Sequence, residues 1–186
     1  MEPWHVILIV AAILVCIVIL WWISTSNNLK IMGVKIDEAL SGIDVALTKR
    51  FDLLTKAVAT AKGYAKHEEE TLTKIIAMRN PGSAATLSEK QQFAQQTAEA
   101  IKSLNVVVEQ YPTLKADTQF TFLQNSIRDV EEQLQAARRL YNSNVSTYNQ
   151  SIIVFPTSIV ANASHLTRRE FFEAEEIKRE DVRIEF

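Results

Sequence analysis

The chain opens with one uninterrupted apolar run, and its later apolar positions recur at helical spacing. Val6 to Ile23 is a stretch of eighteen apolar residues without a charge. At a helical rise of about 1.5 Å per residue it spans roughly 27 Å, which matches the hydrocarbon core of a bilayer. Trp4 lies at one end of the run and Trp21 and Trp22 at the other, where indole rings favour the headgroup level. The pattern predicts a transmembrane helix.

A cleaved signal peptide is the competing interpretation, because Ser24 and Ser26 are small residues just after the run. The residues before the run contain no lysine or arginine, and the run is long for a signal-peptide core. We therefore expect an uncleaved anchor. Lys30 and Lys35 follow the run while no basic residue precedes it, so the positive-inside rule predicts an N-terminus outside and a cytoplasmic helical domain.

After the anchor, an apolar stripe at three- and four-residue spacing predicts a helix from Ile36 to Arg79. No strong breaker precedes Asn80, so the anchor and this helix can be continuous, with Gly33 and Gly42 as points of bending. Asn80-Pro81-Gly82 then ends the helix. The stripe comprises Ile36, Leu40, Ile43, Leu47, Phe51, Leu54, Val58, Ala61, Ala65, Leu72 and Ile75.

Two more helices are predicted beyond Gly82. Ser88 and Gln91 form a capping-box pattern that opens the second helix, and Pro112 ends it. Its apolar face is Phe93, Ile101, Leu104, Val108 and Tyr111. Asp117 or Thr118 can cap the third helix, which ends at Phe155-Pro156. The apolar positions of this helix are Phe120, Leu123, Ile127, Val130, Leu134, Ala137, Tyr141, Val145, Tyr148 and Ile152.

Three aromatic residues, Tyr141, Tyr148 and Phe155, share one heptad position of the third helix. They indicate either a packing seam or an aromatic ligand groove, and we favour the seam, in which each ring is buried and each tyrosine hydroxyl has a partner. Beyond Pro156 the pattern weakens. Arg168 to Lys178 is compatible with a short helix, and Asp181 to Phe186 with an extended tail that lies on a groove.

The composition supports an all-α fold, because four glycines and four prolines in 186 residues leave few tight turns. We expect an N-terminal transmembrane helix followed by an elongated antiparallel three- to four-helix bundle. The expected organisation is a short flank (1–5), the transmembrane helix (6–23), a juxtamembrane segment (24–35), the bundle (36–156), and a C-terminal short helix with an extended tail (157–186).

Candidate chemistry is sparse. The net charge of −2 shows no basic face for nucleic acid, and Cys16 lies inside the apolar run. The chain lacks the two Glu-x-x-His motifs that a di-metal helical bundle requires and has no glycine-rich phosphate loop, and His67-Glu68-Glu69-Glu70-Thr71 lacks the second histidine of a zinc-protease helix. We therefore expect no enzyme activity, metal or cofactor. Charged residues beside the stripes are instead candidates for pairing between helices: Asp44, Arg50, Asp52, Arg138 and Arg139.

Several short motifs follow one another along the chain. They are Ile43-Asp44-Val45-Ala46-Leu47, Arg50-Phe51-Asp52-Leu53, Gly63-Tyr64-Ala65-Lys66-His67-Glu68, Met78-Arg79-Asn80, Glu109-Gln110-Tyr111-Pro112-Thr113-Leu114-Lys115-Ala116, Arg139-Leu140-Tyr141-Asn142, Tyr148-Asn149, Phe155-Pro156 and Phe172-Glu173-Ala174. Their order after a membrane helix closely resembles the bacterial LemA family over nearly the whole chain. Thr55-Lys56 replaces a proline-asparagine pair common in that family, and Ser164-His165-Leu166 replaces an aromatic loop.

The resemblance implies a membrane-anchored helical bundle of bacterial origin, some of whose relatives are associated with specialised internal membranes. It also marks motif positions that have a structural or partner-binding role: Asp44, Arg50, Asp52, Tyr64, Arg79, Tyr111, Pro112, Lys115, Arg139, Tyr141, Asn142, Tyr148, Asn149, Phe155, Pro156, Phe172 and Glu173.

The expected function is a non-enzymatic scaffold in the bacterial cell membrane, or in an internal membrane derived from it, that binds itself or other proteins and organises membrane. We also expect the chain to form homo-oligomers. The reason is helix length, because the first soluble helix should reach about 66 Å and the second about 36 Å. Part of the first helix would then lack a partner, and its membrane-proximal stretch from Ile31 to Leu47 could be covered by the third helix, by the tail or by a neighbouring subunit. The alternative is a signalling adapter that relays motion through a continuous helix.

Overall fold

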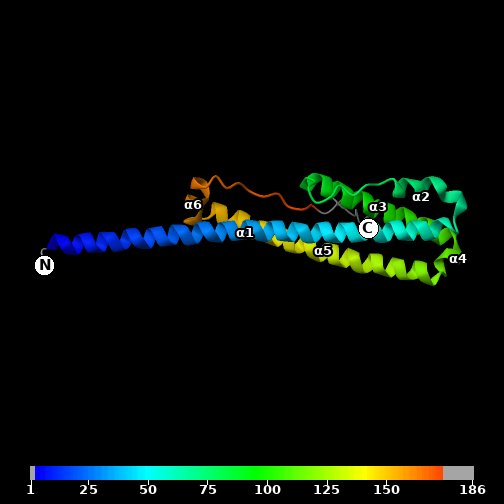
Figure 1. Cartoon of the computed structure of the whole chain (residues 1–186), viewed down its shortest axis with the longest axis horizontal. Helices are drawn as coiled ribbons and strands as arrows, with labels where there is room; N and C mark the ends of the chain where they lie inside the picture. Colours follow the sequence, from blue (N-terminus) through cyan, green and yellow to red (C-terminus); the bar gives the residue numbers. More distant parts are fainter. Residues whose placement is uncertain (1–2, 174–186) are drawn as a thin grey trace, which may run out of the picture. The chain divides into compact units, whose positions relative to one another are not determined.

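The computed structural model describes residues 3–173, and within them it contains helices and no strand, which confirms the all-α prediction (Figure 1). The elements are α1 (Pro3–Lys62), the 3-10 helix η1 (Lys66–Glu68), α2 (Glu69–Ile76), α3 (Leu87–Gln110), α4 (Pro112–Lys115), α5 (Thr118–Ile153) and α6 (Thr157–Ala163). The chain divides into two compact units. Unit 1 is Met1–Ala39 with Tyr141–Phe171, and unit 2 is Leu40–Leu140 with Phe172–Phe186.

The anchor and the helix after it form one continuous α1, as the sequence predicted, and Gly33 and Gly42 lie inside it. The predicted end at Arg79 is wrong, because α1 stops at Lys62. The Gly63 amide donates to the Thr60 carbonyl (3.2 Å), which tightens the last turn. Glycine costs about 1 kcal/mol relative to alanine in a helix interior. The stripe nevertheless continues through η1 and α2, and all of its members beyond Lys62 are buried: Ala65, Leu72 and Ile75.

The connection between α2 and α3 also differs from the prediction. Asn80-Pro81-Gly82 lies in the loop, because α2 already ends at Ile76. Gly82 has φ 83°, the left-handed conformation expected of it. The capping box of α3 is Thr86 with Glu89, two residues before the predicted pair Ser88 and Gln91. The Glu89 carboxylate accepts from the Thr86 amide (2.7 Å), and it is a stronger acceptor than the Gln91 side-chain oxygen would be for the Ser88 amide.

Pro112 ends α3, as predicted, and it also opens α4 as its first residue. The cap of α5 is Asp117, whose Oδ1 accepts from the Phe120 amide (2.7 Å). The helix ends at Ile153, and the short α6 follows. The helix predicted for Arg168–Lys178 is absent from its described part, 168–173. The remainder of that segment, and the predicted tail at Asp181–Phe186, lie outside the described residues.

The core of unit 2 forms where α1, α3 and α5 meet. Most of its buried members come from the three predicted stripes, which confirms them as packing faces, and Ala57, Ala100, Val107 and Leu114 add to it from outside the stripes. The principal members are Leu54, Val58, Ala61, Leu72, Leu104, Val108, Phe120, Leu123 and Ile127. Together they remove a continuous apolar surface from water, which is the main stabilising contribution to a helical bundle.

In unit 1 the last turns of α5 and the helix α6 lie beside α1 (Figure 1). Asn144 Nδ2 of α5 donates to the Lys35 carbonyl of α1 (3.0 Å). Tyr141 and Tyr148 are buried, so the packing-seam interpretation is confirmed for both rings. Within the described residues the predicted hydroxyl partner is found for Tyr141 and not for Tyr148. It is wrong for Phe155, which lies beyond the end of α5 and is 76% exposed. The other buried side chains of this unit include Leu29, Ile36, Val145, Ile152, Val160 and Ala161.

The N-terminal end of α1 is long and apolar enough to cross a membrane, and its apolar window is not buried within the described residues. Every residue from Trp4 to Leu20 is exposed. Trp21 is half-buried and Trp22 is exposed. The predicted anchor from Val6 to Ile23 is therefore a helix that no other part of residues 3–173 covers, as a lipid-facing segment would be.

Candidate functional site

Arg50 joins all three long helices of unit 2. It stands on α1 and is 4% exposed. Its Nη2 lies 2.9 Å from a carboxylate oxygen of Glu131 on α5, and its Nη1 donates to the Ala94 carbonyl of α3 (3.3 Å). The predicted arginine-to-carboxylate pair between helices is thus present at Arg50. Such a pair contributes little net stability after desolvation, but it fixes the register of the helices it joins.

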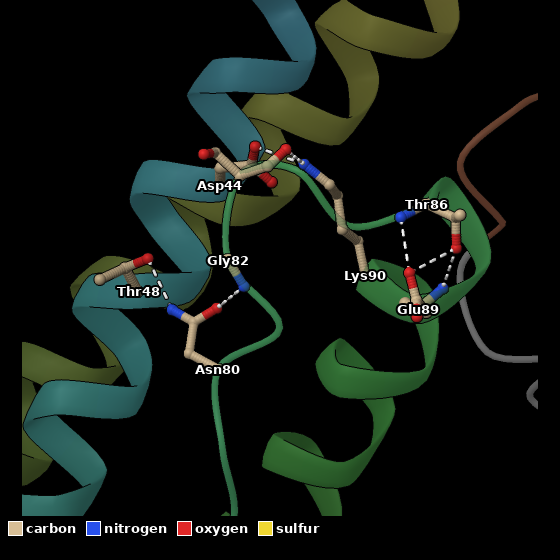
Figure 2. Close-up of polar contacts among 8 residues, drawn as sticks. Asp44, Thr48, Asn80, Gly82, Thr86, Glu89 and Lys90 are labelled. Carbon is tan, nitrogen blue, oxygen red and sulfur yellow. Dashed lines mark hydrogen bonds and ion pairs between the residues drawn. The ribbon is translucent and has the colours of Figure 1, made fainter.

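A second buried cation, Lys90 of α3, was not predicted. Its side chain is 2% exposed, and its Nζ donates to Asp44 Oδ2 on α1 (2.5 Å) and to the Ser83 carbonyl (2.9 Å), as Figure 2 shows for the Asp44 contact. The sequence carried a signal for it, because Lys90 lies three residues before Phe93 and seven before Thr97, which are both buried. A lysine on an apolar stripe requires a partner.

The loop after α2 is held by neighbouring polar contacts (Figure 2). Asn80 Nδ2 donates to Thr48 Oγ1 (2.8 Å), and Asn80 Oδ1 accepts from the Gly82 amide (3.0 Å). Beside these contacts is a pocket of about 450 Å³, and the motif residues Asp44 and Asp52 are among those that line it. Because Lys90 and Asp44 neutralise each other at its wall, the pocket offers no free buried charge for catalysis.

A larger groove of about 660 Å³ lies between α3 and α5, and Arg50 and Glu131 are at its floor. We call this the α3–α5 groove. Gln124 Nε2 of α5 donates to Asn105 Oδ1 of α3 across it (3.3 Å), which fixes the register of its walls. It is lined by Arg50, Ala98, Ile101, Lys102, Leu104, Asn105, Val108, Glu109, Lys115, Gln124, Ile127, Arg128 and Glu131.

The charges of the α3–α5 groove are unbalanced, with four basic and two acidic residues. Arg50 is paired with Glu131, and Lys115 Nζ lies 2.8 Å from a Glu109 oxygen. Among the described residues, Lys102 and Arg128 make no hydrogen bond or ion pair, and both are exposed. The groove therefore combines an apolar lining with two cations available to carboxylates of a partner.

Tyr64 and Asp117 connect the end of α1 with the start of α5. The Tyr64 hydroxyl donates to Asp117 Oδ2 (2.9 Å). The Phe120 amide and then the Tyr64 hydroxyl hold the pKa of the Asp117 carboxyl below its usual range, because both donate to its charged form. The same contact raises the pKa of Tyr64. The motif residue Tyr64 thus has a structural partner.

The motif residues of unit 1 hold the chain that follows α6. The Tyr141 hydroxyl donates to the Glu170 carbonyl (3.0 Å). Asn149 makes two hydrogen bonds with the Arg169 backbone, one from its Nδ2 to the carbonyl and one from the Arg169 amide to its Oδ1 (both 2.9 Å). Burial first, and nearby carboxylates next, raise the pKa of Tyr141 against the opposing effect of Arg169.

The other motif residues are distributed over both units. In unit 2, the Arg138 guanidinium lies 5.1 Å from the ring centroid of Phe172, which is 1% exposed. Tyr111 and Asn142 are half-buried. The exposed motif residues are Asp52, Arg79, Pro112, Lys115, Arg139, Phe155, Pro156 and Glu173. The family positions therefore do not converge on one cleft, and most of those with contacts hold helices or the chain after α6 in place.

No cluster of three or more His, Cys, Asp or Glu suitable for a metal ion occurs among the described residues. His67 is exposed, and Glu70 pairs with Lys74 on the surface of α2 (2.7 Å). Cys16 is exposed within the apolar part of α1.

Comparison with known proteins gives matches over most of the chain. The model of the LemA family matches residues 39–186. Protein LemA of Metamycoplasma hominis is 31% identical over 163 residues, which are 87% of this chain and 74% of that protein. Magnetosome protein MamQ 2 of Paramagnetospirillum magneticum is 32% identical over 74 residues, 40% of this chain and 27% of that protein. Magnetosome protein MamQ of Magnetospirillum gryphiswaldense is 30% identical over 73 residues, which are 39% of this chain and 27% of that protein.

Proposed function

The chain belongs to the LemA family, and from this premise we propose that it is a membrane-anchored, non-enzymatic module that binds other proteins through the α3–α5 groove. The apolar end of α1 serves as the anchor, with the N-terminus outside and the helical domain in the cytoplasm. Because the similarity extends to magnetosome proteins, we propose the cell membrane or an internal membrane derived from it as the location.

The groove carries this proposal. Its apolar lining and its two unpaired cations, Lys102 and Arg128, match a partner surface that presents aliphatic side chains flanked by carboxylates. A volume of about 660 Å³ is large enough for several side chains of a partner. Enzyme function lacks comparable support, because the buried cations Arg50 and Lys90 are both neutralised.

Photo-crosslinking in native membranes tests the proposal. Asn105 lines the groove, whereas its neighbour Val106 is 61% exposed and does not line it. We expect a benzophenone amino acid at position 105 to give a defined protein adduct and the same group at position 106 to give none. Equal yields at both positions, or none at either, would contradict a binding groove.

We also propose that the chain self-associates, although the structure weakens the argument from helix length that first motivated this idea. Ile36, Ile43 and Leu47 of the membrane-proximal stretch are buried within the chain, so that stripe needs no neighbouring subunit. A second face of α1 remains exposed. Within unit 1 it carries Ile31 and Val34, which are 53% and 64% exposed.

Residues 31 and 34 are three positions apart, so they share a face of α1 within unit 1. We propose that a second copy covers this face. Mass measurement in mild detergent should give a dimer or larger assembly, which Ile31→Glu with Val34→Glu reduces to monomer. A wild-type monomer under the same conditions would remove self-association and leave the groove unaffected.

The unbroken α1 favours a second candidate, a signalling adapter. If α1 relays motion, the distance between spin labels on α3 and α5 should change with bilayer thickness, and an insertion of glycines after Lys30 should abolish the change. A distance that is independent of thickness supports the scaffold instead.

A further inference from the structure

An exposed apolar cluster lies at the turn from α5 to α6. Ile153, Val154, Phe155 and Ile159 are 53%, 56%, 76% and 48% exposed, and they fall within seven residues. Elsewhere beyond α1, the exposed large apolar side chains in the described part of the chain are separated along the sequence. A concentrated patch of this kind indicates a surface that is covered by something other than water.

The sequence around the turn has no charged side chain. No Asp, Glu, Lys or Arg occurs between Arg139 and Arg168. The same is true of α1 from Pro3 to Leu29. Unit 1 therefore brings together two charge-free segments, the anchor and the α5–α6 turn. A charge would be costly within the apolar part of a bilayer, so both segments are compatible with contact with lipid.

The register of unit 1 sets the level of the turn along α1. Asn144 of α5 contacts the Lys35 carbonyl of α1, and α5 returns in the direction of the anchor (Figure 1). Ile153 lies nine residues beyond Asn144, about 14 Å along the helix. Counting the same distance back from Lys35 reaches Ser26, about 5 Å past the end of the apolar run at Ile23.

Burial along α1 gives the same level independently. Leu20 is 67% exposed and Ile23 is 51% exposed, whereas Thr25 is 8% exposed and Leu29 is 2% exposed. The protein cover of α1 thus begins where the apolar run ends, and Trp21 and Trp22 stand at this boundary. The polar zone of a bilayer extends roughly 5–7 Å beyond its hydrocarbon core on each side, so the turn lies within that zone.

From the exposed apolar turn, its lack of charge and its level beside the anchor, we propose that the α5–α6 turn is a second membrane contact, with Phe155 and its apolar neighbours inserted among the lipid headgroups and upper acyl chains. Unit 1 is then held to the membrane at two points, α1 and the turn. Two attachments fix the direction in which unit 1 leaves the bilayer, which a single anchor helix cannot do. The proposal rests on the membrane insertion of α1.

Depth-dependent quenching in vesicles tests this contact. The full-length chain with Cys16→Ala carries one fluorescent label at Phe155→Cys, in vesicles of phosphatidylcholine and phosphatidylglycerol. Leu20→Cys is the control for lipid, and Ser143→Cys, an exposed position of α5 in the same unit that lies ten residues, about 15 Å, before Ile153, is the control for water. Ile159→Cys repeats the measurement on the other side of the turn.

We expect the label at position 155 to be quenched by nitroxide at carbon 5 of the acyl chain, several-fold more than the label at position 143, and to be protected from aqueous iodide. Quenching by iodide alone would overturn the proposal. Protection from both quenchers would also overturn it, because a protein surface would then cover the turn. If the label at position 20 is not quenched by lipid, the anchor itself is not inserted and the proposed function fails with it.

Discussion

The two units of the chain hold their helices together with different chemistry. In unit 2, the buried cations Arg50 and Lys90 on α1 and α3 pair with carboxylates of neighbouring helices. In unit 1, the hydrogen bonds from Tyr141, Asn144 and Asn149 are neutral and reach backbone groups, and an ion pair between Arg169 and Asp37 (3.9 Å) joins two exposed side chains. A buried ion pair can be satisfied where several polar groups are close, whereas a charge within the bilayer is costly. The unit that contains the anchor therefore has its ion pair at the surface and holds its helices with neutral hydrogen bonds.

The largest expected effect comes from leaving one buried charge of unit 2 without its partner. Asp44→Ala removes the carboxylate from Lys90, which is 2% exposed, and should lower the free energy of unfolding by about 3 kcal/mol. Lys90→Met, which removes the charge and keeps the length of the side chain, should cost less than about 1 kcal/mol. Chemical denaturation in detergent compares the two variants. Equal losses in the free energy of unfolding would show that the unpaired charge of Lys90 is not the cause.

Smaller losses are expected in unit 1, because its hydrogen bonds are neutral. Asn149→Ala removes both contacts with the Arg169 backbone and should cost about 1–2 kcal/mol in local stability. Amide hydrogen exchange should accelerate in residues 165–171 and remain unchanged in α3. Uniform acceleration over both units would contradict a local role.

The two buried tyrosines of unit 1 offer a matched pair. Tyr141→Phe removes the hydrogen bond to the Glu170 carbonyl and should cost about 1 kcal/mol. Within the described residues the Tyr148 hydroxyl makes no hydrogen bond, so Tyr148→Phe should cost less than about 0.5 kcal/mol. Thermal unfolding distinguishes the two variants. A greater loss of stability in Tyr148→Phe than in Tyr141→Phe would contradict a stabilising hydrogen bond at Tyr141.

The smallest effect concerns the exposed contact between Tyr64 and Asp117. The folded state lowers the Asp117 pKa, so the contact stabilises the protein above the usual carboxyl pKa, and this stabilisation is lost as the pH falls through the lower folded value. Tyr64→Phe should raise the Asp117 pKa only in part, because the Phe120 amide remains. NMR titration below about pH 5 measures the Asp117 pKa in both proteins. An Asp117 pKa that is the same in the variant would exclude a contribution from Tyr64.

The sequence predicted the buried faces better than the element boundaries. The positions of the third stripe are buried or half-buried as far as Ile152, because burial follows from spacing alone. The end of α1 at Lys62 was missed because it depends on a single glycine, Gly63. The cap of α3 was misplaced because two capping-box patterns overlap within Thr86–Gln91. Phe155 kept the heptad spacing, but α5 ends before it.

The candidate sites were less predictable than the fold. The Arg50 pair followed from a charge beside a stripe, whereas the choice of Glu131 as its partner depends on the register of α1 against α5. The α3–α5 groove depends on which residues of two distant segments face each other, and one sequence does not specify that. The family resemblance identified motif residues, most of which serve packing and hydrogen bonding.

The central claim is that unit 2 binds a protein partner through the α3–α5 groove. The most direct measurement is the adduct yield from the crosslinker at Asn105 in native membranes, with and without the double substitution Lys102→Glu and Arg128→Glu. Both side chains are exposed, so the fold should be retained. We predict that reversing the two charges abolishes the adduct while circular dichroism stays unchanged. An undiminished adduct in a folded variant would contradict the claim.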